Sequence, residues 1–153
     1  MPVEARLELD QFTPAKELER FIAGRVDDGA VVSFVGLARN TDSRGAPVDM
    51  LELQWHPVMT QRSLDVIAAE ALSRFGVSDV AVVHRGGRVT PGEPIVFVAC
   101  AAPRRREAFL AADCLMDRLK TEAMFWKREI GPGGERWIEP SPRDLADAAR
   151  WSD

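Results

Sequence analysis

The sequence is poor in the residues that build metal centres or disulfide frameworks. Its 153 residues include only two cysteines and two histidines. The cysteines, Cys100 and Cys114, form no C-x-x-C spacing, and two histidines without a supporting cluster make no metal site. We therefore expect no bound metal, and we expect the two thiols to be buried and inert, because free cysteine packs as a small hydrophobic side chain.

Long apolar runs and an excess of positive charge are also lacking. No apolar run approaches the roughly 20 residues that span a bilayer. The N-terminal segment, MPVEARLELD, is too polar and acidic for a signal peptide. The formal net charge is −4, whereas nucleic-acid binding rests on many contacts between basic side chains and phosphates. These features predict a cytoplasmic protein without general affinity for nucleic acid.

The composition suits one globular domain. A hydrophobic content of 46% argues against disorder, and a chain of this length can bury a substantial core. The sequence contains no internal repeat and no low-complexity segment. We therefore treat residues 1–153 as a single domain.

The apolar periodicity predicts an α+β fold with mostly antiparallel strands, two main helices, two short helices and a C-terminal hairpin. The residues from Gly29 to Gly36 form a β-branched run, which we expect to be a central strand. The hairpin is expected at Ile130–Gly134, with Trp126 and Trp137 packed across it. Strands are expected at 3–9, 29–36, 49–55, 77–84, 95–100, 124–130 and 135–139. Helices are expected from Thr13-Pro14, over 57–75, from Pro103 to about Lys120, and from Ser141 onward.

Basic residues lie at both ends of the helix that follows Pro103. Arg104 and Arg105 stand at its start, where free N–H groups and the helix dipole attract anions. Lys120 stands at its end, and Lys127 on the next strand could complete an anion pocket if that strand folds back beside the helix. The alternative is that the arginines are solvated and Lys120 complements the helix dipole. The expected apolar face consists of Phe109, Ala112, Leu115, Met116 and Leu119.

Arg39 follows the strand that we expect at 29–36. It is either an ordinary solvated arginine at a strand end or a residue that projects into the same pocket as Lys120. Strand ends and loops often carry functional residues, and a guanidinium fits phosphate in a bidentate manner. These arguments from the residues alone leave both interpretations open.

Several segments resemble the large, catalytic subunit of molybdopterin synthase in sequence, order and spacing. The most specific is LKTEAMFWKRE at 119–129. The others are VVSFVGLARN at 31–40, HPVMT at 56–60, VVHRGGRVTPGE at 82–93, IVFVAC at 95–100 and GERW at 134–137. The likeness covers nearly the whole chain. One departure is that this chain has Arg104-Arg105 where the family usually has His-Arg.

The resemblance implies an α/β-hammerhead fold and a homodimer within a heterotetramer. In that family a small ubiquitin-like partner carries sulfur as a thiocarboxylate on its C-terminal Gly-Gly tail, which inserts into a pocket of the large subunit. Two sulfurs are transferred to cyclic pyranopterin monophosphate (precursor Z) to form the dithiolene of molybdopterin. The resemblance implies no cofactor, and it implies that sulfur arrives on the partner rather than on a thiol of this chain.

On this basis we expect a sulfurtransferase with two catalytic lysines, Lys120 and Lys127. The expected substrate-binding residues are Arg39, Arg104, Arg105 and Arg128, although alternation along a strand points Arg128 away from Lys127. His84-Arg85 is interpreted as structural or as a pocket wall. Two other classes stay open: a non-enzymatic anion-binding or regulatory module on the same fold, and an RNA-binding module that uses the basic segment.

Overall fold

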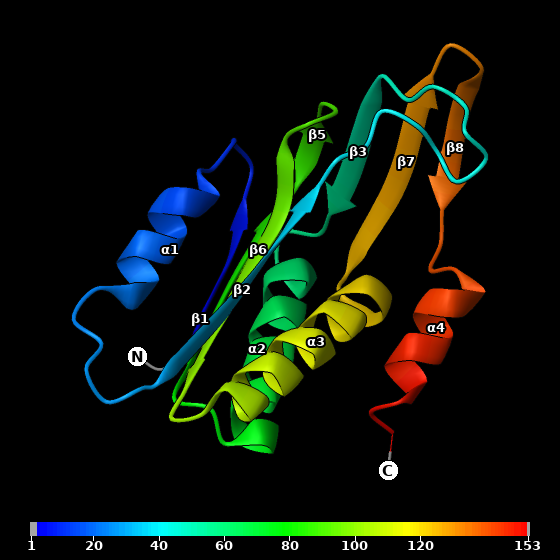
Figure 1. Cartoon of the computed structure of the whole chain (residues 1–153). Helices are drawn as coiled ribbons and strands as arrows, with labels where there is room; N and C mark the ends of the chain where they lie inside the picture. The colour runs from blue at the N-terminus through cyan, green and yellow to red at the C-terminus, as the bar shows by residue number, and fades with distance from the viewer. Residues whose placement is uncertain (1–2, 153) are drawn as a thin grey trace.

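Two four-stranded sheets form the framework of the protein in the computed structural model, which describes residues 3–152 (Figure 1). The first sheet has the order β1 (Val3–Glu8), β4 (Asp79–Arg85), β6 (Pro94–Ala102), β2 (Ala30–Leu37). The second has the order β5 (Gly87–Val89), β3 (Met50–Trp55), β7 (Phe125–Gly131), β8 (Gly134–Ile138). Only the β1–β4 pair is parallel among these strands. The expected α+β class with mostly antiparallel strands is confirmed.

Four helices of the described residues cover the first sheet and extend beside the second. The two main ones, α2 (Met59–Phe75) and α3 (Arg105–Glu122), pack together against one face of the first sheet. The short helix α1 (Pro14–Ile22) packs on the opposite face, and α4 (Pro142–Ala149) lies against α3 (Figure 1). Within residues 3–152, no helix is long and apolar enough to cross a membrane.

Helix ends follow local rules that the sequence already displays. Thr13 is the N-cap of α1 and Pro14 is its first residue, a position where proline lacks no needed hydrogen bond. Gly76 ends α2 in the left-handed conformation, with a φ of 63°. Ser141 caps α4 with a complete capping box. These three predicted ends are confirmed.

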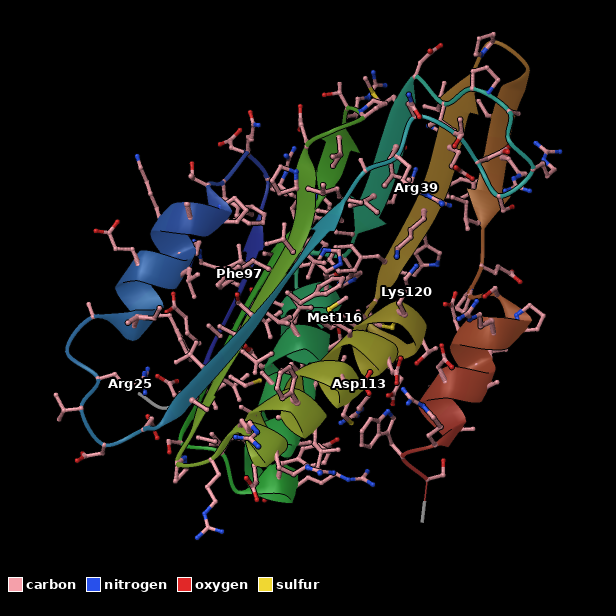
Figure 2. The ribbon with its side chains drawn as sticks, viewed as in Figure 1. Arg25, Arg39, Phe97, Asp113, Met116 and Lys120 are labelled. Atoms are coloured by element: carbon pink, nitrogen blue, oxygen red, sulfur yellow. The ribbon has the colours of Figure 1, made fainter. Side chains whose placement is uncertain are left out.

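The core lies on both sides of the two central strands, β4 and β6. Apolar side chains on one face of these strands pack beneath α2 and α3, where Leu64 and Leu115 are fully buried. On the other face, Phe97 is 1% exposed and packs with Phe21 of α1 (Figure 2). Cys100 and Cys114 are both buried free thiols, as expected. Burial raises the pKa of Cys100 to about 12, which makes this thiol unreactive.

The strand β2 is not central, contrary to the sequence prediction. It pairs only with β6 and therefore forms an edge of the first sheet. The side chains of Phe34, Val35 and Leu37 are exposed. Both faces of the C-terminal half of β2 are therefore accessible to solvent. The sequence run is as apolar as a central strand, and sequence alone does not distinguish a buried strand from an edge that another molecule covers.

Two smaller predictions are also wrong. Phe109 of α3 is 59% exposed because the buried stripe runs through Ala108, Ala111, Ala112, Leu115 and Leu119, one position away. Trp137 lies opposite Arg128 in the hairpin rather than opposite Trp126. The strand β5, only three residues long, was not predicted at all.

Candidate active site

A cavity of about 630 Å³ lies where the two sheets, the end of α3 and the start of α4 meet. Arg39, Lys120 and Lys127 all line it, so the structure brings together three of the six residues selected from the sequence. Lys120 comes from the last turn of α3, and Arg39 follows β2 on the same side of the second sheet (Figure 2). Lys120 and Lys127 are two of the three lysines in the whole chain.

The two lysines are neighbours because the chain reverses sharply between α3 and β7. Ala123 leaves the helix in an extended conformation, with a ψ of 137°, and only Met124 separates it from the strand. Two side chains of α2 fix this junction. The Thr60 hydroxyl donates to the Met124 carbonyl at 2.6 Å, and the Ser63 hydroxyl accepts from the Met124 N–H at 3.1 Å. Sequence reasoning did not find Thr60, whose complete burial is unusual for a hydroxyl and requires such partners.

Alternation along β7 decides which side chains enter the cavity. Phe125, Lys127 and Glu129 line it, whereas the residues between them face the other side of the sheet. The pKa of Lys127 is lowered to about 8, first by burial of its ammonium group and then by the positive charge of Lys120. A lysine with such a pKa exchanges protons near neutral pH, as a catalytic acid or base must.

A buried histidine supports this wall of the cavity. His84 of β4 is 3% exposed, and its ring stacks on Phe125 with the ring centroids 4.1 Å apart. Its Nδ1 lies 2.8 Å from the Arg85 carbonyl oxygen, so Nδ1 carries the proton and donates it. The pKa of His84 is lowered to about 3 by burial and then by the charge of Lys127. His84 is therefore a neutral residue beneath the pocket wall, in agreement with its interpretation from the sequence.

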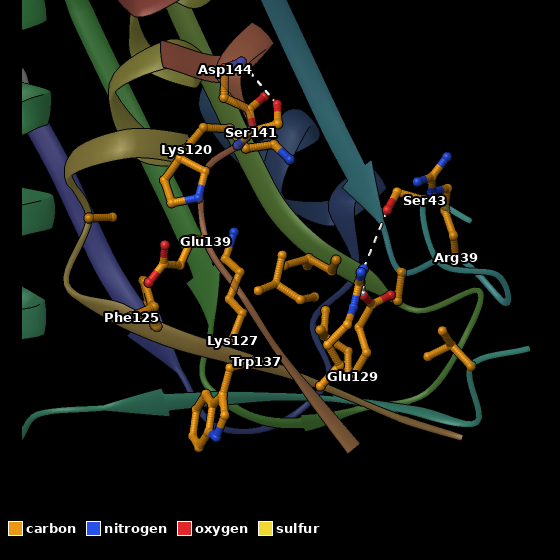
Figure 3. A pocket seen from close by; sticks show the side chains of 18 of the residues that line it. Arg39, Ser43, Lys120, Phe125, Lys127, Glu129, Trp137, Glu139, Ser141 and Asp144 are labelled. Atoms are coloured by element: carbon orange, nitrogen blue, oxygen red, sulfur yellow. Dashed lines mark hydrogen bonds and ion pairs between the residues drawn. The ribbon is translucent and has the colours of Figure 1, made fainter. Parts of the chain in front are cut away.

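The opposite wall is held by an ion pair between β7 and β8. Arg136 donates to Glu129 at 3.1 Å and to the Ser43 hydroxyl at 3.3 Å (Figure 3). Ser43 belongs to the loop after β2, which Asp42 organises by accepting hydrogen bonds from two backbone N–H groups of the loop, each within 2.9 Å. The sequence indicated Arg136 only as part of GERW, and no local signal predicted its partners.

Arg104 and Arg105 do not line this cavity. The expectation that the basic residues at both ends of the helix share one pocket within the chain is therefore corrected. Arg104 is the N-cap of α3 and Lys120 lies in its last turn. Sixteen residues of helix separate them by about 24 Å along the axis, at about 1.5 Å per residue. Folding the next strand back beside the helix brings Lys127 to the C-terminal end only. A role for these arginines in substrate binding stays a prediction.

Arg128 also does not line the cavity. Its guanidinium donates to Glu52 and to Glu135, both at 2.8 Å, and lies over the ring of Trp137, 5.3 Å from its centroid. Arg128 is opposite Glu52 and Trp137 in the strand ladder, so its side chain lies on the face of β7 opposite to that of Lys127. These contacts give Arg128 a structural role in the hairpin, and its role in substrate binding stays a prediction.

Comparison with known proteins assigns the family. A family model described as MoaE protein matches residues 7–122. The chain belongs to the MoaE protein family. It is 52% identical over 140 residues to the molybdopterin synthase catalytic subunit of Caulobacter vibrioides, which covers 92% of this chain and 91% of the relative. It is 44% identical over 148 residues to that of Pseudomonas aeruginosa, covering 97% and 98%.

A solved MoaE structure has the same fold. The molybdopterin biosynthesis MoaE protein from Burkholderia ambifaria superimposes with a TM-score of 0.82 at 41% sequence identity, over 99% of both chains. This agreement extends past the part matched by the family model to β7, β8 and α4, which carry Lys127 and close the cavity. The cavity is thus part of a complete MoaE fold.

Proposed function

We propose that this chain is the catalytic subunit of a molybdopterin synthase, a sulfurtransferase of molybdenum cofactor biosynthesis. The observation that carries the proposal is the meeting of Lys120, Lys127 and Arg39 in one cavity of a MoaE fold. The substrate is precursor Z, and the product is the dithiolene of molybdopterin. An anion-binding module without chemistry needs no lysine with a pKa near neutrality, whereas this cavity contains one.

The cationic residues have separate roles in this proposal. Arg39 and Lys120 are exposed at the mouth of the cavity and hold the cyclic phosphate of the substrate through charge-assisted hydrogen bonds. The thiocarboxylate sulfur forms a bond to a substrate carbon, and water then cleaves the resulting thioester, which leaves the sulfur on the substrate and a carboxylate on the tail. Lys120 stabilises the negative charge that builds on oxygen in these steps. Lys127 lies deeper in the cavity and acts as the acid or base that exchanges a proton during the reaction.

The sulfur donor is a small ubiquitin-like protein with a C-terminal Gly-Gly thiocarboxylate. An extended tail without side chains can enter a narrow pocket, because glycine allows close approach of backbone to backbone. Binding then has two parts, a contact between protein surfaces and an inserted tail. We propose a cytoplasmic location for both subunits, since this chain keeps two free cysteines and free thiols are typical of reducing compartments.

We also propose that Arg104 and Arg105 act on the substrate of the other protomer in a homodimer. The bare edge of β2 presents unpaired backbone groups and exposed apolar side chains, which a second copy would cover. An isologous antiparallel pairing of two β2 edges places the start of one strand beside the end of the other.

This pairing would bring the separated basic residues together. The segment before α3 lies against the residue before β2. A Cβ placed on Gly29 would be only 2.5 Å from the Pro103 carbonyl oxygen, so the N-terminus of α3 is next to the start of β2. The end of β2 borders the cavity through Leu37 and Arg39. Arg104 and Arg105 of one protomer would then reach the cavity of its partner.

The function is tested by mixing this protein with a thiocarboxylated small subunit and precursor Z and measuring molybdopterin formation. Deleting the last two residues of the small subunit is expected to eliminate turnover and to leave detectable association, because the surface contact remains. Association is measured by titration calorimetry with the intact small subunit as control. Complete loss of association would show that the tail alone provides the binding.

The cysteines provide a separate prediction about the route of sulfur. A Cys100→Ala, Cys114→Ala double variant is expected to keep at least half of the turnover, because sulfur arrives on the partner. Both side chains are buried, so each small cavity lowers the free energy of unfolding by roughly 1 kcal/mol. Turnover is compared with the parent protein at a temperature where circular dichroism shows both to be folded. A folded double variant without turnover would contradict the proposed route.

A further inference from the structure

The first turn of α4 holds a carboxylate in a fixed position at the cavity. The Asp144 Oδ2 accepts a hydrogen bond from the Ser141 N–H at 2.9 Å, and the Asp144 N–H donates to the Ser141 hydroxyl at 3.1 Å. This capping box fixes the side chain and uses only one carboxylate oxygen. Asp144 and Ser141 both line the cavity that contains the two lysines (Figure 3).

The position of α4 is itself held from its far end. Trp151 donates its indole N–H to the Asp117 carboxylate at 2.7 Å, and Arg150 donates to the same oxygen at 2.7 Å. The Trp151 ring packs edge-on against Phe75, with the centroids 5.5 Å apart. Helix α4 is thus fastened to α3 and α2, and the carboxylate at its start is fixed relative to Lys120.

Asp144 interacts electrostatically with both lysines. Burial alone would raise the pKa of Asp144, but the two Ser141 hydrogen bonds and then the charges of Lys120 and Lys127 hold it below its ordinary value. In the opposite direction, the negative charge of Asp144 raises the pKa of Lys127 against the larger lowering effects of burial and Lys120. Asp144 is therefore ionised and opposes the two lysines at neutral pH.

We propose that Asp144 is a positioning residue of the sulfur transfer, which acts as a fixed counter-charge to the lysine pair. Its carboxylate would set both the net positive charge offered to the anionic substrate and the pH at which Lys127 exchanges its proton. This role rests on the proposed function of the cavity. It gives the capping box a second purpose besides starting a helix.

The other titratable groups near Lys127 are neutral, paired with each other, or exposed to solvent. His84 is uncharged near neutral pH, and Glu129 is paired with Arg136 at 3.1 Å. Glu139 is exposed at the cavity, whereas Asp144 is partly buried and held by its cap. The titratable and charged groups around Lys127 are Arg39 after β2, His84 of β4 behind Phe125, Lys120 on α3, Glu129 on β7, Arg136 on β8, Glu139 before α4 and Asp144 on α4.

The test is an Asp144→Asn variant, which keeps an oxygen for the Ser141 N–H and removes the charge. The pKa of Lys127 is expected to fall by about half a unit to one unit, because its ammonium loses a stabilising negative neighbour. Whichever form of Lys127 the reaction needs, the limb of the pH–rate profile that it governs moves to lower pH. The KM for precursor Z is expected to fall severalfold at neutral pH, because the cavity becomes more positive.

Two control variants separate charge from structure. Ser141→Ala weakens the cap, at a cost of about 1 kcal/mol in stability, but keeps the carboxylate, so the Lys127 titration should stay within about 0.2 units of the parent. Glu139→Gln removes an exposed carboxylate and is expected to shift the titration less than Asp144→Asn does, because solvent screens it.

The lysine titration is measured directly by NMR of the free protein with ¹³C-labelled lysine. The chain has three lysines, so Lys16→Ala and Lys120→Ala variants assign the signals. An unchanged Lys127 midpoint in Asp144→Asn, or an equal shift in Ser141→Ala, would overturn the proposal. Because this measurement uses neither substrate nor partner, it remains decisive if the parent protein makes no molybdopterin, which would count against the proposed function alone.

Discussion

Replacing Lys127 with alanine is expected to remove sulfur transfer almost completely while the protein stays folded. Lys127 is the group in the cavity that we expect to exchange a proton near neutral pH, and loss of a general acid or base costs on the order of 10²–10⁴-fold in rate. The measurement is molybdopterin formation at saturating small subunit and precursor Z. Lys16→Ala on α1 is the matched control, because Lys16 does not line the cavity.

Lys120→Ala is expected to lose most activity as well, with a rise in KM because Lys120 also binds the anion. Its position in the last turn of α3, outside the buried stripe, leaves the fold intact. Turnover within twofold of the parent for either folded lysine variant would contradict the assignment of the cavity as the active site.

Lys127 also makes the stability of the protein depend on pH, and this dependence distinguishes loss of the catalytic group from loss of the fold. The pKa of Lys127 is about 8 in the folded protein and has an ordinary value of 10.5. Between these two values the unfolded chain binds more protons, so the parent becomes more stable as pH rises from 8 to 10.5. Lys127→Met has no such group. Its melting temperature at pH 7 should therefore equal or exceed that of the parent, and this advantage should shrink above pH 8.

The second large effect is expected in mixed dimers that carry different lesions in their two chains. A Lys120→Ala chain and an Arg104→Ala, Arg105→Ala chain should each be nearly inactive as homodimers. If the arginines reach into the partner's cavity, a dimer with one chain of each kind has one doubly damaged cavity and one intact cavity. Such dimers, purified through two different tags, should show about half of the parental activity.

The control for this experiment combines all three substitutions in one chain and pairs it with an unmodified chain. That dimer has one lesion of each kind in different cavities if the arginines act across the interface, and it should be nearly inactive. If they act within their own chain, the two results are reversed, with the first dimer inactive and the second half active.

A Val35→Lys variant on the β2 edge should shift the protein towards monomer in analytical ultracentrifugation and reduce activity.

Local sequence rules predicted the helices, most of the strands and the helix ends well. The caps at Thr13 and Ser141 and the glycine that ends α2 are short-range features, because each depends on side chains and dihedral angles within a few residues. The placement of Lys127 relative to Arg128 also followed from alternation along a strand. The lysine pair was found because the helix and the following strand are consecutive in the chain.

The sequence predictions were wrong or incomplete where the outcome depends on contacts between residues that are distant in the chain. The apolar run of β2 gave no sign that this strand forms an edge, because the position of a strand in its sheet depends on how the other strands pair. Arg104 and Arg105 were joined to Lys120 through their proximity in sequence, although a rigid helix separates its two ends. The hydrogen bond from the Thr60 hydroxyl to the Met124 carbonyl joins residues 64 positions apart, and no pattern in a single sequence indicates such a pair.

The two-residue junction between α3 and β7 restricts how this protein can change during evolution. Ala123 and Met124 set the register of β7, in which Lys127 lies opposite Leu53 and its side chain faces the cavity. One residue inserted after Met124 would exchange the two faces of the strand, so that the indole of Trp126 would occupy the cavity and Lys127 would point outward. Insertions and deletions at this point should therefore be as damaging as substitution of the lysine. The number of residues between Lys120 and Lys127 should therefore matter to activity as much as their identity.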